Sequence, residues 1–161
     1  MTSIKDRRSN QVFKRTGIIL GLIAILALGA TPTMAADVPT IKIGLVTYLS
    51  GGAAGPFGVP GRNGAELMIE AINAGKVPAP YNTKGVAGAQ LETVLIDEAG
   101  NSQKQVTEYR KLIQKQEVDV VIGYISSGHC KAIAPVAEEL GKLTIFFDCG
   151  TPQIFEDVVT S

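Results

Sequence analysis

The stretch "IKIGLVTYLSGGAAGPFGVPGRNGAELMIEAIN", residues 41–73, decides the fold because a strand pattern passes into a helix pattern through a glycine-rich loop. Its first part, Ile41–Leu49, is rich in β-branched residues and is typical of a buried strand. Beyond the loop, apolar residues recur at helical spacing and should form one helix face: Ala65, Met68, Ile69 and Ile72. The stretch therefore predicts a strand, a long loop and a helix.

The same alternation continues towards the carboxyl end of the chain. Strand patterns occupy residues 90–100, 118–125 and 142–150, and helix patterns occupy residues 102–116 and 128–141. Ser102 is expected to cap the first of these helices. Because one helix separates each strand from the next, the strands cannot form hairpins and should be parallel. The sequence therefore predicts an α/β fold with a doubly wound parallel sheet.

The first residues of the chain have the pattern of an export signal. Residues 1–16 are polar with a basic excess, residues 17–30 are apolar, and small residues follow. This pattern predicts a secretory signal peptide over residues 1–35, cleaved after Ala35, with cleavage after Ala36 as the alternative. A permanent membrane anchor is the alternative, but the apolar run is shorter than the ~18 residues of a spanning helix. Residues 36–161 would then form the exported chain.

The charge pattern excludes one class of partner. The 161 residues carry 15 Lys and Arg against 15 Asp and Glu, so the formal net charge is zero. Because the leader holds an excess of basic residues, its removal leaves a mildly acidic chain. No basic stripe with interleaved aromatic residues is present in the sequence, so nucleic acid is not an expected partner.

In a parallel sheet of this kind, ligands bind outside the carboxyl ends of the strands. The loop that follows the first strand lacks the Gly-Lys-Ser/Thr ending of a phosphate-binding loop and the Gly-x-Gly-x-x-Gly register of a dinucleotide site. No nucleotide or other cofactor is therefore expected. The loop should instead curl over a cleft edge with Phe57 as an apolar wall, unless Phe57 only covers the end of the sheet.

The loop after the third strand pattern carries Ser126 and Ser127 in front of a helix. Ser127 is expected to be the N-cap, and the backbone N–H groups beyond it could hold a carboxylate together with a serine hydroxyl. A serine that caps the helix and binds nothing is the alternative. His129 is expected to be solvated, and with two cysteines it has no recognisable metal-ligand spacing, so no metal site is expected.

The cysteines leave two interpretations open. Cys130 and Cys149 both fall near the same predicted edge of the sheet. A disulfide between them requires Cα atoms within ~7 Å. Otherwise they would be small packing residues or free thiols.

Five segments together carry a resemblance to a known family: "IKIGLVTYLSG", "FGVPGRNGAELMIEAINAG", "GAQLETVLIDEAGNSQKQVTEYRKLIQKQEVDVVIG", "SSGHCKAIAPVAEELG" and "TIFFDCGTP". In their order and spacing, from Ile41 to about Ile154, the chain resembles the type I periplasmic solute-binding proteins of ABC transporters, specifically the branched-chain amino acid (leucine/isoleucine/valine-binding) group. The resemblance implies a receptor that captures a small solute in the periplasm and delivers it to an ABC permease in the inner membrane.

Members of that family clamp the solute between two lobes by hinge closure. The resemblance therefore implies that residues 36–161 are a partial N-terminal lobe of a two-lobe solute-binding domain. Alone, such a lobe should bind weakly or not measurably. Apolar residues that would pack against further elements should be exposed, with partial order or aggregation as the consequence.

The resemblance also implies the residues that meet the solute. Ser127 falls where the family's serine meets a ligand carboxylate, and Phe57 falls at an aromatic position of the first loop. Asp148 and Gly150 fall in the segment after the fourth strand that supplies further contacts. Asp148 replaces a residue that is often small, and its charge would favour an ammonium, hydroxyl or amide N–H and repel a second carboxylate. A branched-chain amino acid, another amino acid, a polar amide and a hydroxylated aromatic acid therefore all remain candidates.

Two other classes of protein stay open. The first is an exported α/β serine hydrolase with Ser126 or Ser127 as nucleophile, but the Gly-x-Ser-x-Gly elbow is absent and His129, the one histidine, is too close in sequence. No enzymatic activity is therefore expected. The second is a ligand-sensing receptor domain that shares the binding-protein fold.

Overall fold

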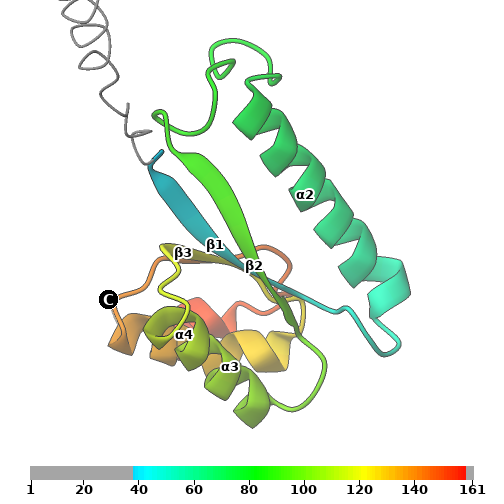
Figure 1. Ribbon diagram of the computed structural model, residues 1–161. Helices are drawn as coiled ribbons and strands as arrows, with labels where there is room; N and C mark the ends of the chain where they lie inside the picture. Colours follow the sequence, from blue (N-terminus) through cyan, green and yellow to red (C-terminus); the bar gives the residue numbers. More distant parts are fainter. Residues whose placement is uncertain (1–37, 159–161) are drawn as a thin grey trace, which may run out of the picture. The chain divides into compact units, whose positions relative to one another are not determined.

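The computed structural model describes residues 38–158 (Figure 1). The chain divides into two units, Met1–Asp37 and Val38–Ser161, and the described residues belong to the second. The expected signal peptide, residues 1–35, lies outside the described residues. Within residues 38–158, no helix is both long and apolar enough to cross a membrane.

The sheet has four parallel strands in the order β2-β1-β3-β4, which confirms the predicted α/β fold with a parallel sheet. The strands are β1 (Thr40–Thr47), β2 (Gln90–Asp97), β3 (Val120–Gly123) and β4 (Thr144–Phe146). β2 is added on one side of β1, and β3 and β4 are added on the other side. The direction in which strands are added to the sheet therefore reverses between β1 and β3. In open α/β sheets, ligands bind at the carboxyl ends of the strands at such a switch point.

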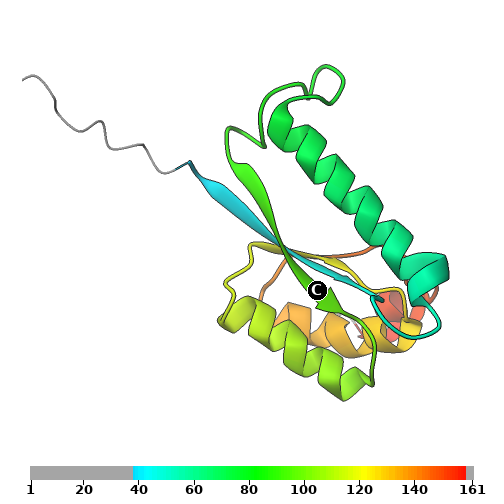
Figure 2. The same ribbon diagram turned by 45° about the vertical axis from the view of Figure 1, so that its right-hand side comes forward.

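The helices are α2 (Val59–Ala74), α3 (Ser102–Gln114) and α4 (Ser127–Glu139), with short π-helical segments η1 (Ala54–Gly58) and η2 (Ile154–Val158). Figures 1 and 2 show α3 and α4 side by side on one face of the sheet and α2 on the other. The predicted cap of α3 was wrong by one residue. Asn101 has an extended backbone and its side chain accepts a hydrogen bond from Lys104 N at 2.9 Å, whereas Ser102 is already helical.

The core lies between the sheet and the pair α3 and α4. Most of its fully buried side chains come from β1, β3 and these helices, and they include Val46, Tyr109, Leu112, Val121 and Ile133. These are the faces on which the apolar residues recur at strand or helix spacing. Burial of this face holds β1 and β3 against α4, and it thereby fixes the elements that carry the predicted site.

The opposite face of the sheet is less covered. The predicted helix α2 forms, but none of its residues is buried, and Met68 of its expected apolar face is 55% exposed. Three alternating residues around β4 are also exposed, Leu143, Ile145 and Phe147. This agrees with the expectation that apolar side chains would be exposed.

Candidate functional site

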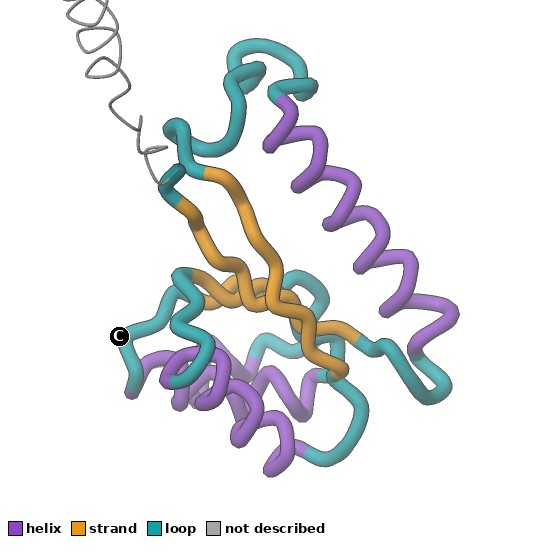
Figure 3. Tube along the Cα trace, viewed as in Figure 1, coloured by secondary structure: helices purple, strands orange, loops and turns teal. Residues whose placement is uncertain are grey.

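The candidate site lies where β1 and β3 end, and loops leave both strands at this edge (Figure 3). Gly123 ends β3 with φ +155°, and a Cβ there would overlap the carbonyl of Val46 on β1. The next residue, Tyr124, is fully buried and has φ 66°, in the left-handed region that non-glycine residues seldom adopt. Such strained positions persist only where surrounding contacts impose them, and they concentrate at functional sites.

The contacts that impose this turn come from Glu98, which directly follows β2. Its carboxylate is fully buried and accepts hydrogen bonds from Ile125 N at 2.9 Å and from Ser126 N at 2.8 Å. It also faces His129 Nδ1 at 3.1 Å. A buried carboxylate is tolerated only when such donors surround it. Glu98 therefore holds the turn between β3 and α4.

The neighbouring acid, Asp97, holds the other loop of the site. It accepts hydrogen bonds from Leu49 N at 2.9 Å, from Ser50 Oγ at 2.6 Å and from Ala99 N at 3.0 Å. Burial pushes the pKa of Asp97 up, but these hydrogen bonds outweigh it and leave the pKa below its usual range. Asp97 thus orders the start of the glycine-rich loop.

That loop returns to the sheet through Gly58, the last residue of η1. A Cβ at Gly58 would overlap the carbonyl of Tyr48, so only glycine lets η1 approach the end of β1 this closely. Phe57 stands beside it and is 54% exposed. Because Phe57 is not buried against the end of the sheet, its side chain remains accessible from solvent.

The structure corrects the predicted cap of α4. Ser126, with an extended backbone, is the N-cap, and Ser127 is the first helical residue. Ser126 makes no side-chain capping bond. The first bond of the helix runs from Cys130 N to Ser126 O at 2.9 Å, so the amides of Ser127, Gly128 and His129 precede the hydrogen-bond ladder.

The structure brings two of the predicted residues together across the edge of the sheet. A Cβ built on Gly150 would lie 4.0 Å from Ser127 Oγ, so the segment after β4 passes beside the start of α4. Asp148 lies in the same segment and is exposed. Ser126, Ser127 and Gly150 thus border one small region. Asp148 lies two residues before Gly150 in the same segment of the chain.

A disulfide holds these two segments. Cys130, in the first turn of α4, is bonded to Cys149, and their Cα atoms lie 6.2 Å apart. Of the interpretations that the sequence left open, the disulfide is therefore confirmed, and packing residues or free thiols are excluded. The bond fixes the position of Asp148 and Gly150 relative to Ser127.

The expectation of a solvated His129 was wrong. His129 is 5% exposed because it faces Glu98 and lies beside Tyr48, with ring centroids 6.3 Å apart. Among the described residues, no serine hydroxyl is hydrogen-bonded to His129, so the Glu98–His129 pair is not completed to a catalytic triad. Residues 38–158 also contain no group of three or more His, Cys, Asp or Glu placed to hold a metal ion.

Sequence reasoning missed two residues of this region, Tyr48 and Glu98. Burial and the nearby Glu98 carboxylate raise the pKa of Tyr48, while a hydrogen bond with the Ser126 side chain works against them. Tyr48 lies near the end of the Ile41–Leu49 strand pattern and Glu98 near the end of the pattern at residues 90–100, so both lie at the predicted ligand edge. This position in the sequence could have marked Tyr48 and Glu98 as site residues. Their contacts with Ser126 and His129 could not be predicted, because those residues are far away in the sequence.

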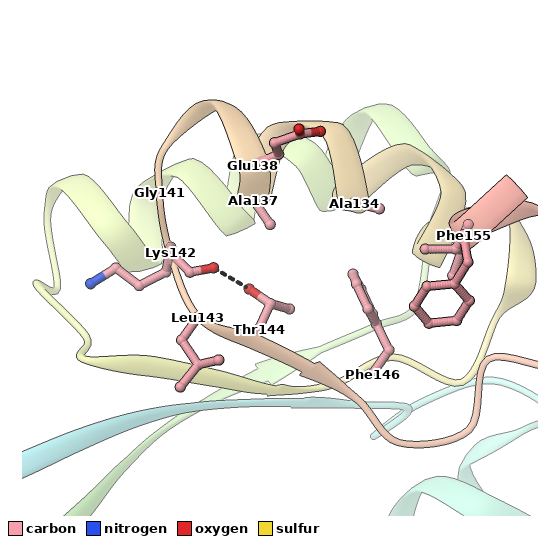
Figure 4. Close-up of a pocket in the computed structure, with 10 residues that line it drawn as sticks. Ala134, Ala137, Glu138, Gly141, Lys142, Leu143, Thr144, Phe146 and Phe155 are labelled. Atoms are coloured by element: carbon pink, nitrogen blue, oxygen red, sulfur yellow. Dashed lines mark hydrogen bonds between the residues drawn. The ribbon is translucent and has the colours of Figure 1, made fainter. Parts of the chain in front are cut away.

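The apolar cavity beside α4 is a different feature. It has a volume of about 380 Å³ and lies between the second half of α4, β4 and η2. Figure 4 shows the rings of Phe146 and Phe155 at one end and the hydrogen bond between Thr144 and the Lys142 carbonyl at the other. None of the five residues predicted from the sequence lines it. This cavity is therefore separate from the candidate site at the loop edge.

Comparison with known proteins identifies the family. The family model of the periplasmic binding proteins matches residues 40–157. The leucine-, isoleucine-, valine-, threonine- and alanine-binding protein of Pseudomonas aeruginosa is 33% identical over 143 residues, which are 88% of this chain and 35% of that protein. The chain thus spans about a third of the length of this relative.

Solved structures agree. The branched-chain amino acid transporter substrate-binding protein LivJ from Streptococcus pneumoniae, in complex with isoleucine, has a TM-score of 0.63 and 26% identity, covering 74% of this chain and 32% of that chain. A solute-binding protein of an ABC transporter from R. palustris, in complex with benzoate, has a TM-score of 0.61 and 29% identity, covering 71% of this chain and 29% of that chain. The parallel sheet matches the type I architecture of these proteins. The chain belongs to the periplasmic binding protein family.

Proposed function

We propose that the chain is the solute-binding component of an ABC importer, and that it captures an amino acid or a related small carboxylate or amide in the periplasm. It would deliver this solute to a permease in the inner membrane. The observation that carries the proposal is the convergence of Ser126, Ser127 and Gly150 at the carboxyl edge of the sheet. Family membership supports binding rather than catalysis as the role of this edge.

The chemistry of the edge suits a carboxylate. The amides of Ser127, Gly128 and His129 precede the first bond of α4, and they lie at the positive end of the helix dipole. Backbone N–H groups in this position bind anions readily. The relatives are named for, or contain, amino acids and benzoate, and all of these solutes carry a carboxylate. This shared group is the part of the solute that we assign to the start of α4.

Asp148 would then select among carboxylates. Its exposed side chain lies one residue before the disulfide that fixes it beside α4. A negative charge there favours a solute with an ammonium, a hydroxyl or an amide N–H, and it disfavours a dicarboxylate. Phe57, exposed on η1, would cover an apolar part of the solute.

The remaining parts of the proposal concern export and domain organisation. Residues 1–35 would act as a cleaved signal peptide that directs the chain to the periplasm. Residues 36–161 would form part of the N-terminal lobe of a two-lobe solute-binding domain.

An NMR titration of the ¹⁵N-labelled chain, purified after export, tests the proposal. L-isoleucine, benzoate and 4-hydroxybenzoate would be added up to tens of millimolar. At least one of them should shift the amide resonances of Ser127, Gly128 and His129 in a saturable way, and Ser127→Ala should weaken that binding. Saturable shifts confined to other parts of the chain would contradict it.

A further inference from the structure

Glu98 joins parts of the sheet that are not neighbours. Its backbone N–H donates to Thr47 O at 2.8 Å, so the residue is anchored at the end of β1. Its side chain accepts from Ile125 and Ser126, in the turn that leaves β3. In the sheet order, β1 separates β2 from β3. Glu98 therefore reaches across the end of β1 to hold a turn that its own strand does not touch.

Because of this carboxylate, the start of α4 is held without a capping hydrogen bond from the Ser126 side chain. An N-cap serine ordinarily accepts a hydrogen bond from an amide in the first turn of its own helix. Ser126 does not, and its own amide is bound to Glu98 instead. His129 attaches the first turn of α4 to the same carboxylate. The start of α4 is thus held from outside the helix, and the serine hydroxyls are not used as caps.

We propose that Glu98 is the positioning residue of the solute site, and that it holds the Tyr124–Ser126 turn so that Ser127 and the first amides of α4 receive a solute carboxylate. This rests on the function proposed above. Glu98 does not touch the solute in this arrangement. It acts through the hydrogen bonds that it accepts from Ile125 and Ser126. These bonds offset the free-energy cost of the left-handed backbone conformation of Tyr124.

The charge of Glu98 makes the proposal sharply testable. A negative side chain close to a carboxylate site repels the solute, so removing its charge would by itself strengthen the binding of an anion. Removing the acceptor that orders the turn would weaken the same binding. The substitution Glu98→Gln removes the charge and leaves a single neutral amide oxygen to accept from donors that two carboxylate oxygens now serve, so it weakens the acceptor as well, and the two effects have opposite signs. The direction of the change therefore tells whether Glu98 positions the turn or is only a neighbouring charge.

The experiment compares benzoate with benzamide, which has the same ring without the charge. Affinities for both would be measured by NMR titration on the full chain, purified after export, and on its Glu98→Gln variant. Loss of the ordered turn should weaken benzoate binding by about tenfold, the worth of one charge-assisted hydrogen bond, and benzamide binding by clearly less. Glu139→Gln is the matched control, because Glu139 is an exposed carboxylate on α4 paired with Arg110, and it should leave the ratio unchanged.

Equal or tighter benzoate binding by Glu98→Gln would overturn the proposal, and so would an equal loss for both probes. If this variant does not fold, His129→Leu removes only one donor to Glu98, and it should show the same asymmetry with a smaller loss. If the unmodified chain binds neither probe, the proposed function fails for these solutes. Hydrogen exchange at Ile125 and Ser126 then decides: exchange that is slow in the chain and fast in Glu98→Gln supports the positioning role, and equal rates refute it.

Discussion

Cys130 and Cys149 are joined by a disulfide that closes a loop with a sequence separation of 19 residues and ties α4 to the segment after β4. Both segments carry residues of the candidate site, Ser127 on one side and Asp148 and Gly150 on the other. The disulfide therefore contributes to the stability of the chain and also fixes the geometry at the edge of the sheet.

Removing this disulfide should destabilise the chain. For the double variant Cys130→Ala/Cys149→Ala, a loop of this length predicts a loss of about 3 kcal/mol in the free energy of unfolding. Urea denaturation monitored by circular dichroism measures it, and reduction of the unmodified chain should reproduce most of the loss. A change below ~1 kcal/mol in both experiments would contradict the prediction.

Two buried tyrosines should respond differently to loss of the hydroxyl. The hydroxyl of Tyr124 is buried without a hydrogen-bond partner among the described residues, whereas that of Tyr109 lies 2.7 Å from Thr144 Oγ1. Tyr124→Phe should be neutral or stabilising, because no bond is lost, and Tyr109→Phe should lower the free energy of unfolding by about 1 kcal/mol. Paired denaturation curves test this. A larger loss for Tyr124→Phe than for Tyr109→Phe would show the assignment to be wrong.

The stability of the chain at acidic pH should depend on Asp97. Its pKa in the folded chain is lowered, since hydrogen bonds from Ser50, Ala99 and Leu49 outweigh the opposing effect of burial. A lowered pKa gives stabilisation that is fully present above the unfolded value of about 3.9 and is lost as pH falls through the folded pKa. Asp97→Asn should therefore flatten the fall of the free energy of unfolding below about pH 4.

Urea titrations between pH 5 and the acid limit of folding would measure this slope. Ser50→Ala, which removes the hydroxyl donor to Asp97, should flatten it partly. An unchanged slope in Asp97→Asn would mean that other groups control acid unfolding.

The chain by itself should bind its solute weakly. A micromolar Kd requires about −8.2 kcal/mol. The start of α4 offers two or three charge-assisted hydrogen bonds of ~1.5–3 kcal/mol each. Association consumes ~4 kcal/mol or more of that sum, so the chain should bind at about millimolar strength at best or not measurably. Isothermal titration calorimetry that gave a micromolar Kd for this chain with L-isoleucine or 4-hydroxybenzoate would contradict this.

The fold could be predicted from the sequence because its signals are local. The β-branched run at Ile41–Leu49 and the helical spacing of residues 102–116 each indicate their element without knowledge of any partner. The site is different, since the burial of His129 depends on Glu98, 31 residues earlier. Ser126, the N-cap that the structure shows in place of Ser127, likewise donates its amide hydrogen to this distant carboxylate. Cysteine spacing likewise could not decide between a bond and two thiols.

A crystal structure of the protein soaked with L-isoleucine or benzoate tests the central claim most directly. The account predicts the solute carboxylate within hydrogen-bond distance of the Ser127 amide and hydroxyl, with Ile125 and Ser126 still bound to Glu98. A solute bound elsewhere on the protein, with the start of α4 occupied only by solvent, would contradict it.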